Sequence, residues 1–211
     1  FHLPVAVHND AQAAVLAELR FGIGRELNDF VAITIGTGVG GGIVSGGKLL
    51  CGQHGFAGSL GHQTIRFDGR PCNCGRLGCL EAYVSAAALV REYQDQQVDL
   101  HQETTGDAIS AMQIGQLALA GDAGALAAYS HLAKYLAEGI ANMFNILDPQ
   151  AILISGGLVE GHTHFIAEVE REVTALLHFG DIRKPRIQLS AAGQYAGVQG
   201  AAAAIFDLID E

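Results

Sequence analysis

The segment "DFVAITIGTGVGGGIVSGGKLL", residues 29–50, decides how the chain folds. It begins with an apolar, β-branched run from Phe30 to Ile35, which is typical of a buried strand. A glycine-rich turn separates this run from a second one, Gly42 to Val44, and the pair Gly46-Gly47 indicates another turn. The pattern therefore predicts a β-hairpin.

Strand and helix patterns alternate on both sides of the hairpin. Strands are expected in "LPVAVHND" (residues 3–10), "AILISGGL" (151–158) and "RIQLSAA" (186–192). Helices are expected over residues 11–21, 80–94, 108–120, 123–147, 164–178 and 200–208. No internal repeat or linker divides the chain, so we expect one domain.

Composition excludes several classes of protein. With 49% hydrophobic residues and a mean hydropathy of +0.26, the 211 residues suffice for one sizeable core, or for one large domain of a bigger protein. We find neither an uninterrupted apolar run of about 18 residues nor a signal peptide, so we expect a cytoplasmic protein without a membrane span. The net charge is −10 and the basic residues are scattered, which argues against nucleic-acid binding through this segment.

Three of the four cysteines gather in "GHQTIRFDGRPCNCGRLGCLEAY", residues 61–83. A disulfide is the weaker explanation, because Cys72 and Cys74 are separated by a single residue and the third thiol, Cys79, would stay unpaired. Zinc prefers four nitrogen or sulfur ligands, and His62 completes a Cys3His set with these thiols. A structural zinc site is therefore expected within residues 62–81. The alternative is a reduced loop with three free thiols, and Cys51, which lies apart, is expected to be a spare thiol.

Two glycine-rich segments, "TIGTGVGGG" and "ISGGL", each follow an apolar strand. Glycines let a backbone approach phosphate oxygens closely and point its N–H groups at them. The candidates for nucleotide contacts are Thr37, Gly38, Gly40, Gly41 and Gly42 in the first segment and Gly156 and Gly157 in the second. Ordinary hairpin turns use the same residues, and the spacing fits neither a Rossmann fingerprint nor a Walker A loop.

The pair Asn9-Asp10 ends the first expected strand. The Asp10 carboxylate is a candidate general base, which would accept the proton of a hydroxyl that attacks phosphorus, while the Asn9 amide could hold the ring that carries this hydroxyl. The competing interpretation is a helix N-cap, since Asp or Asn commonly precedes a helix such as "AQAAVLAE". His62 and Glu81, which flank the cysteine loop, could present polar groups to a sugar.

Four motifs, "VHNDAQAAVLAE", "IGTGVGGGIVSGGKLLCGQHGFAGSLGH", "CNCGRLGCLE" and "ILISGGL", occur in the order found in the ROK family of sugar kinases and sugar-responsive repressors. The resemblance covers almost the whole chain. It implies an α/β, actin-like (ribonuclease H-like) fold, in which two domains surround a cleft. It also implies phosphoryl transfer from ATP, with Mg²⁺, to a hydroxyl of a hexose or N-acetylhexosamine, and a homodimer.

The resemblance also implies a role for each matching residue. Asp10 matches the catalytic base, and Asn9, His62 and Glu81 match groups that contact the sugar. His62 with Cys72, Cys74 and Cys79 matches a zinc site that shapes the sugar pocket and takes no part in the chemistry. Thr37 and Gly38 match the phosphate side of the nucleotide site, and Gly156 and Gly157 match the adenosine side.

Two departures from the family pattern affect the expected function. No D-x-G-x-T phosphate loop occurs in these 211 residues, so we expect residues 1–211 to be the larger, C-terminal domain of a ROK-type protein. Ser59 stands where the kinases usually have Glu, three residues before His62. A sugar kinase is the leading expectation. The alternatives are the sugar-binding effector domain of a ROK repressor, with DNA-binding helices before Phe1, and a purely structural zinc module.

Overall fold

A computed structural model describes residues 5, 7–99, 109–178 and 180–209 of the chain. Seven α-helices and five strands occur in this part. They are α1 (Asp10–Phe21), β1 (Phe30–Ile35), β2 (Val39–Ser45), β3 (Lys48–Leu49), α2 (Ala86–Asp99), α3 (Ala111–Leu119), α4 (Ala123–Leu147), β4 (Ala151–Ser155), α5 (Thr163–Leu176), α6 (Gly180–Arg183), β5 (Ile187–Leu189) and α7 (Ala196–Ile209). Short 3-10 turns span Ile23–Glu26, Leu60–His62, Leu80–Ala82 and Gly193–Tyr195.

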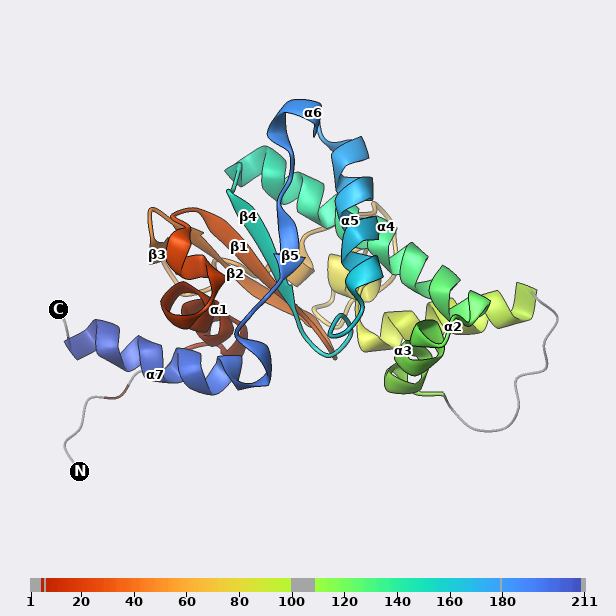
Figure 1. Ribbon diagram of the computed structural model, residues 1–211, viewed down its shortest axis with the longest axis horizontal. Coiled ribbons are helices and arrows are strands. Elements are labelled where there is room, and N and C mark those ends of the chain that lie inside the picture. The colour runs from red at the N-terminus through yellow and green to blue at the C-terminus, as the bar shows by residue number, and fades with distance from the viewer. Residues whose placement is uncertain (1–4, 6, 100–108, 179, 210–211) are drawn as a thin grey trace.

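The five strands form one mixed sheet in the order β3-β2-β1-β4-β5 (Figure 1). β1 and β2 are antiparallel, whereas β1 pairs with β4, and β4 with β5, in parallel. Because Thr34 lies opposite Ser155 in the parallel pair, β1 and β4 end at the same edge of the sheet. The two glycine-rich segments follow these strand ends and are therefore neighbours.

Each face of the sheet is covered by helices. Side chains of a strand alternate between the two faces, so Val31, Ile33 and Ile35 join the larger core with α4 and α5. Phe30 and Ala32 point the other way, toward Val15 of α1. Figure 1 shows α7 next to α1 on this second side. The result is a sheet between two helical layers, and the α/β class is confirmed.

The expected hairpin is present, but its second strand is longer than predicted. β2 begins at Val39, three residues before the predicted start at Gly42. Glycines are rare inside strands, but here they admit close neighbours: a Cβ on Gly41 would lie 2.8 Å from Leu60 Cδ1, and one on Gly42 would lie 3.0 Å from Val15 Cγ2. Two of the glycines assigned to a phosphate turn are therefore explained by packing.

Two predicted helix starts and one predicted strand also need correction. The helix expected over residues 80–94 is α2, which begins at Ala86, because residues 80–82 form a 3-10 turn tied to Gln63 by the Leu80 N–H. The final helix begins at Ala196 and contains the glycine that was predicted to start it. No strand is present at residues 5 and 7–9, and the other residues of "LPVA" lie outside the described part.

The predicted bounds of one helix are confirmed. The helix over residues 123–147 has the predicted bounds as α4 and ends before Pro149. Among the described helices, none combines the length and apolar character needed to cross a membrane.

Helices α1 and α7 cross at Gly200, which is buried. A Cβ built on Gly200 would overlap the carbonyl oxygen of Ala13, a backbone atom that cannot swing aside. Gly197, on the same helix, is exposed and has no heavy atom within 4 Å of its built Cβ. An alanine at Gly197 would therefore change only the helix propensity, whereas an alanine at Gly200 would also change the packing against α1.

We expect Gly200→Ala to lower the free energy of unfolding by about 1–3 kcal/mol, because the overlap outweighs the higher helix propensity of alanine. Gly197→Ala is the matched control and should raise stability by up to about 1 kcal/mol. Urea denaturation followed by circular dichroism measures both. A Gly200→Ala variant as stable as the wild type would show that the two helices do not approach this closely.

Candidate functional site

A cavity of about 610 Å³ opens beside the start of α1 and β2. We call it the α1/β2 cavity. Its walls come from three segments: the N-terminus of α1, the start of β2, and the loop that leads to the turn Leu60–His62. Its lining residues include Asn9, Gln12, Gly40, Phe56, Ser59 and His62. Four predicted site residues, Asn9, Gly40, Ser59 and His62, are thus brought to one cavity.

Asn9 is the N-cap of α1, as the competing interpretation of the pair Asn9-Asp10 predicted. Its Oδ1 accepts hydrogen bonds from the N–H groups of Ala11 (3.0 Å) and Gln12 (3.3 Å). Because the oxygen is occupied, the NH2 group of this cavity-lining side chain is the part left for a ligand. Asp10 is the first helical residue and is exposed, and one of its oxygens also accepts from Ala11 N–H at 2.8 Å. It adjoins the cavity-lining Asn9.

Ser59 is exposed, and its hydroxyl donates to the carbonyl of Phe56 at 2.9 Å, within the same loop. Phe56 is itself 79% exposed. Gln12, by contrast, is buried, and sequence patterns did not single it out. A polar residue among the apolar positions of "AQAAVLAE" was the only available signal.

The four predicted metal ligands lie together. The ligand atoms of His62, Cys72, Cys74 and Cys79 are all within 4.8 Å of one another. His62 Nδ1 is 3.7 Å from Cys72 Sγ, and the sulfurs of Cys74 and Cys79 are 3.6 Å apart. This Cys3His group could hold a metal ion. Cys51 lies elsewhere, on the wall of the α1/β2 cavity, and takes no part in the group.

The thiols of the group differ in acidity. Burial of Cys79, with further contributions from the neighbouring thiols of Cys74 and Cys72, raises the pKa of its thiol to about 12. The pKa of Cys74 is lowered, chiefly by the backbone hydrogen bond at Arg76. A cation bound to these sulfurs would stabilise the thiolates, because the thiolate is the form that coordinates metal.

Glu81 connects the metal group to the hairpin turn. Its Oε2 accepts the N–H of Val39 at 3.0 Å, and its Oε1 lies 3.8 Å from Cys72 Sγ. Gly38 is packed against the same carboxylate, so that a Cβ on Gly38 would be 2.5 Å from Oε2. Glu81 is half-buried behind the turn and does not line the α1/β2 cavity.

The loop that carries the cysteines is anchored to the helices by Arg70. Its guanidinium stacks over the Tyr83 ring, 4.8 Å from the centroid, and its Nη2 is 2.7 Å from Oε1 of the buried Glu92 in α2. The second oxygen of Glu92 is 2.9 Å from Nδ1 of His131 in α4. A buried carboxylate is costly unless it is paired, so this arrangement favours the observed loop position.

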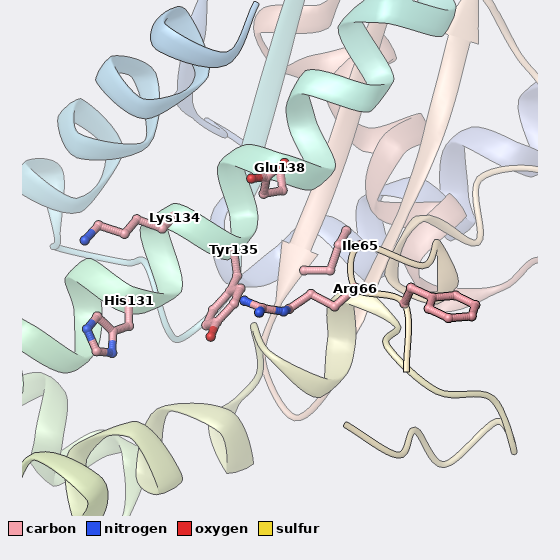
Figure 2. Close-up of a pocket in the computed structure, with 7 residues that line it drawn as sticks. Ile65, Arg66, His131, Lys134, Tyr135 and Glu138 are labelled. Carbon is pink, nitrogen blue, oxygen red and sulfur yellow. The ribbon is translucent and has the colours of Figure 1, made fainter. Parts of the chain in front are cut away.

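A hollow of about 570 Å³ lies beside this anchor, since His131, the partner of Glu92, lines it. Figure 2 shows its lining residues. Four of its residues, His131, Lys134, Tyr135 and Glu138, project from α4, and Arg66 of the cysteine loop lies against the Tyr135 ring, 6.0 Å from its centroid. None of the predicted site residues lines this hollow.

A second cavity, of about 360 Å³, lies on the other side of the hairpin turn. Thr37 and Gly157 line it, together with Tyr129 and His162. Burial raises the pKa of Tyr129 to about 12. The pKa of His162 is lowered, mainly by burial and to a smaller extent by the charge of the nearby His164. Both rings are therefore neutral at pH 7 and form a mostly uncharged wall.

Gly156 has a structural role at the edge of this second cavity. Its φ is +109°, and a Cβ would overlap the carbonyl oxygen of Ile35 at the end of β1. The turn Gly36–Gly38 thus separates two cavities, with Asn9 and His62 on one side and Gly157 on the other.

Comparison with known proteins identifies the family. The model of the ROK family matches residues 1–207. The chain belongs to the ROK family. Its sequence is 37% identical to a glucokinase of Halalkalibacterium halodurans, over 94% of this chain and 62% of that enzyme. This ROK chain therefore spans less than two thirds of the length of that relative.

Solved structures of both functional classes of the family resemble this chain. The ROK family glucokinase of Streptomyces griseus, determined with glucose and AMPPNP, has a TM-score of 0.85 and 34% identity, over 95% of this chain and 67% of the enzyme. A ROK family transcriptional regulator, a homologue of the E. coli MLC protein, has a TM-score of 0.86 and 32% identity, over 99% of this chain and 53% of the regulator. The expected actin-like fold class is confirmed.

We expect the purified ROK chain to contain about one metal ion and Cys79→Ser to lose it, because a single missing ligand opens the four-ligand group. The loss should lower Tm by about 5–10 °C, since each kcal/mol of stability is worth about 2–4 °C in a chain of this size. Elemental analysis and calorimetry measure both quantities. Cys51→Ser is the matched control and should change neither. A folded wild type with far less than one metal equivalent would contradict the expectation.

Proposed function

We propose that this chain is the sugar- and adenosine-binding part of a ROK sugar kinase, which transfers the γ-phosphoryl group of ATP to a hydroxyl of a hexose or N-acetylhexosamine. One observation carries the proposal. Asn9, which directly precedes the exposed Asp10, and His62 of the Cys3His group line one cavity, which a glycine turn separates from a second, mostly uncharged cavity. Acceptor and nucleotide would approach each other across that turn.

In this proposal Asp10 is the general base. Its exposed carboxylate would accept the proton of the sugar hydroxyl as that oxygen attacks phosphorus. Asn9 would donate from its free NH2 group to a neighbouring sugar oxygen. Thr37, Gly38, Gly156 and Gly157 would contact the nucleotide, whose phosphates carry Mg²⁺ in such reactions. Gly40, on the wall of the α1/β2 cavity, lies where the transferred group would pass.

The metal in this proposal is zinc. A tetrahedral Zn²⁺ with ligand distances of about 2.1–2.3 Å requires its ligand atoms to be about 3.5–3.8 Å apart. Two of the separations within the Cys3His group, 3.6 and 3.7 Å, agree with this requirement, and all of its ligand atoms lie within 4.8 Å of one another. If Nδ1 of His62 coordinates zinc, its Nε2 is left as an N–H donor for a sugar oxygen. Zinc would orient His62 and take no part in phosphoryl transfer.

We further propose that residues 1–211 form the C-terminal domain of a homodimeric ROK protein. The family resemblance supports the dimer, and the partial coverage of the H. halodurans glucokinase supports the domain assignment. The phosphate loop D-x-G-x-T, which does not occur in these residues, would come from another part of such a protein.

A second candidate function is the sugar-binding domain of a repressor. The observation that favours it is Ser59, because a kinase of this family usually carries Glu at this position. The similarity to the transcriptional regulator, with a TM-score of 0.86, is as strong as the similarity to the glucokinase, with 0.85. DNA contacts would then come from residues outside this segment.

Asp10→Asn tests the kinase directly. In the intact protein with ATP and Mg²⁺, we expect sugar-dependent ADP formation to fall about 10²-fold or more, because the general base is lost. Sugar affinity should stay nearly unchanged. Asp95→Asn, at an exposed position of α2, is the control and should retain full activity. Undiminished turnover by Asp10→Asn would show that Asp10 belongs only to the helix terminus, and a wild type that binds sugar without forming ADP would favour the repressor.

Ser59→Glu tests the departure from the family pattern. A carboxylate that accepts a sugar hydroxyl is worth about 1–2 kcal/mol more than a neutral partner, so we expect glucose to bind about 5- to 30-fold more tightly. Calorimetric titration with glucose, N-acetylglucosamine and N-acetylmannosamine measures the change. Gln53→Glu adds the same charge to the same loop, outside the cavity lining, and is the control. Weaker binding of an N-acetyl sugar by Ser59→Glu would instead show that serine makes room for the acyl group.

A further inference from the structure

The loop of residues 51–59, which we call the cavity loop, forms one wall of the α1/β2 cavity. It has no regular secondary structure, and Gly52, Gly55 and Gly58 have φ values of +71°, +77° and +87°. Its internal hydrogen bonds are few: Ala57 N–H donates to the carbonyl of Cys51 at 3.1 Å, and the Ser59 hydroxyl donates to the carbonyl of Phe56. The loop therefore depends on outside contacts for its position.

Gln12 of α1 supplies such contacts. Its side-chain Nε2 donates to the carbonyl oxygens of Gly55, at 3.0 Å, and Ala57, at 3.2 Å. Both partners are acceptors, which determines that the NH2 end of the amide faces the loop. Within the described part of the chain, these two are the only hydrogen bonds that join residues 52–57 to anything outside the cavity loop.

The position of Gln12 makes this tie relevant to the cavity. Gln12 is 6% exposed and lies three residues after Asn9, so the two side chains occupy the same face of α1, one turn apart. Asn9 is on the helical wall of the cavity, whereas Ser59 and Phe56 are on the loop wall. The amide of Gln12 therefore joins the two walls and sets the distance between them.

We infer that Gln12 is a positioning residue for the ligand of the α1/β2 cavity: it touches the loop rather than the reacting atoms and holds the loop wall against the helix that carries Asn9 and Asp10. This role in sugar binding rests on the proposed function. An apolar residue would cover the same helix face equally well, so packing alone gives no reason for an amide at this position. The two loop carbonyls do give one.

Gln12→Glu is the most direct test, because it keeps the size of the side chain and replaces the only donor with a carboxylate oxygen that repels both carbonyls. Gln12→Leu removes the donor without adding charge. Gln150→Glu is the matched control, since Gln150 lies at the opposite end of β4 and uses its oxygen to accept from Asn28 and Asp29 N–H groups. Amide hydrogen exchange and titration with glucose, N-acetylglucosamine and N-acetylmannosamine are measured on each variant.

We expect both Gln12 variants to speed amide exchange in residues 51–59 at least about 10-fold. Amide exchange in residues 72–79 of the cysteine loop should stay unchanged, and so should the metal content. The sugar that binds the wild type most tightly should bind about 10-fold more weakly, equivalent to about 1.4 kcal/mol. Gln150→Glu should change neither quantity.

Three results would overturn the inference or its premise. Unchanged exchange in residues 51–59 would show that Gln12 does not hold the loop. Faster exchange with unchanged sugar affinity would show that the loop position is irrelevant to the ligand. A wild type that binds none of the three sugars would overturn the proposed function instead, and the exchange data alone would then decide whether Gln12 anchors the loop.

Discussion

The parallel pairing of β1 with β4 is the constraint on which the site depends. It brings the ends of these strands, Ile35 and Ser155, to one edge of the sheet although 120 residues separate them in sequence. The pairing allows Gly156 to pack on the carbonyl of Ile35, where a side chain would not fit. The hairpin turn, the start of α2 and both cavities are arranged around this edge, as the hydrogen bond from Ala86 N–H to the carbonyl of Gly36 illustrates.

The cysteine loop is held in place by polar contacts. A segment rich in Gly, Pro and Asn buries too little apolar surface to hold its own shape. Here two sets of polar contacts replace a hydrophobic core: the Cys3His group inside the loop and the ion pair of Arg70 with Glu92 beneath it. Because Glu81 contacts both Cys72 and the backbone of Val39, the position of the loop also determines the position of the hairpin turn.

Local patterns predicted the features that local physics determines. The apolar run gave the bounds of β1, the period of the long helix gave those of α4, and ligand spacing identified the four residues of the metal group. The predicted starts of β2, α2 and α7 were wrong where tertiary contacts override propensity, as in α7, whose Gly200 packs closely on α1. Gln12 and Glu92 escaped notice because their partners lie 43 or 39 residues away, and a hydrogen bond over that distance leaves no periodic signal. Asn9 and Asp10 were candidates from their position at the start of a helix and from family resemblance, whereas Ser59 came from the resemblance alone. Geometry adds that Asn9 and Ser59 line one cavity.

His62 belongs to two structures at once, since one ring nitrogen is within the metal group and the residue lines the α1/β2 cavity. A metal ion bound by this group and a ligand bound in the cavity would share His62, so their binding would be thermodynamically linked. If the metal increases the affinity of a cavity ligand by orienting the imidazole, that ligand must increase the affinity for the metal by the same factor. A cell that supplies the ligand would in this way help the protein to retain its metal under conditions of metal scarcity.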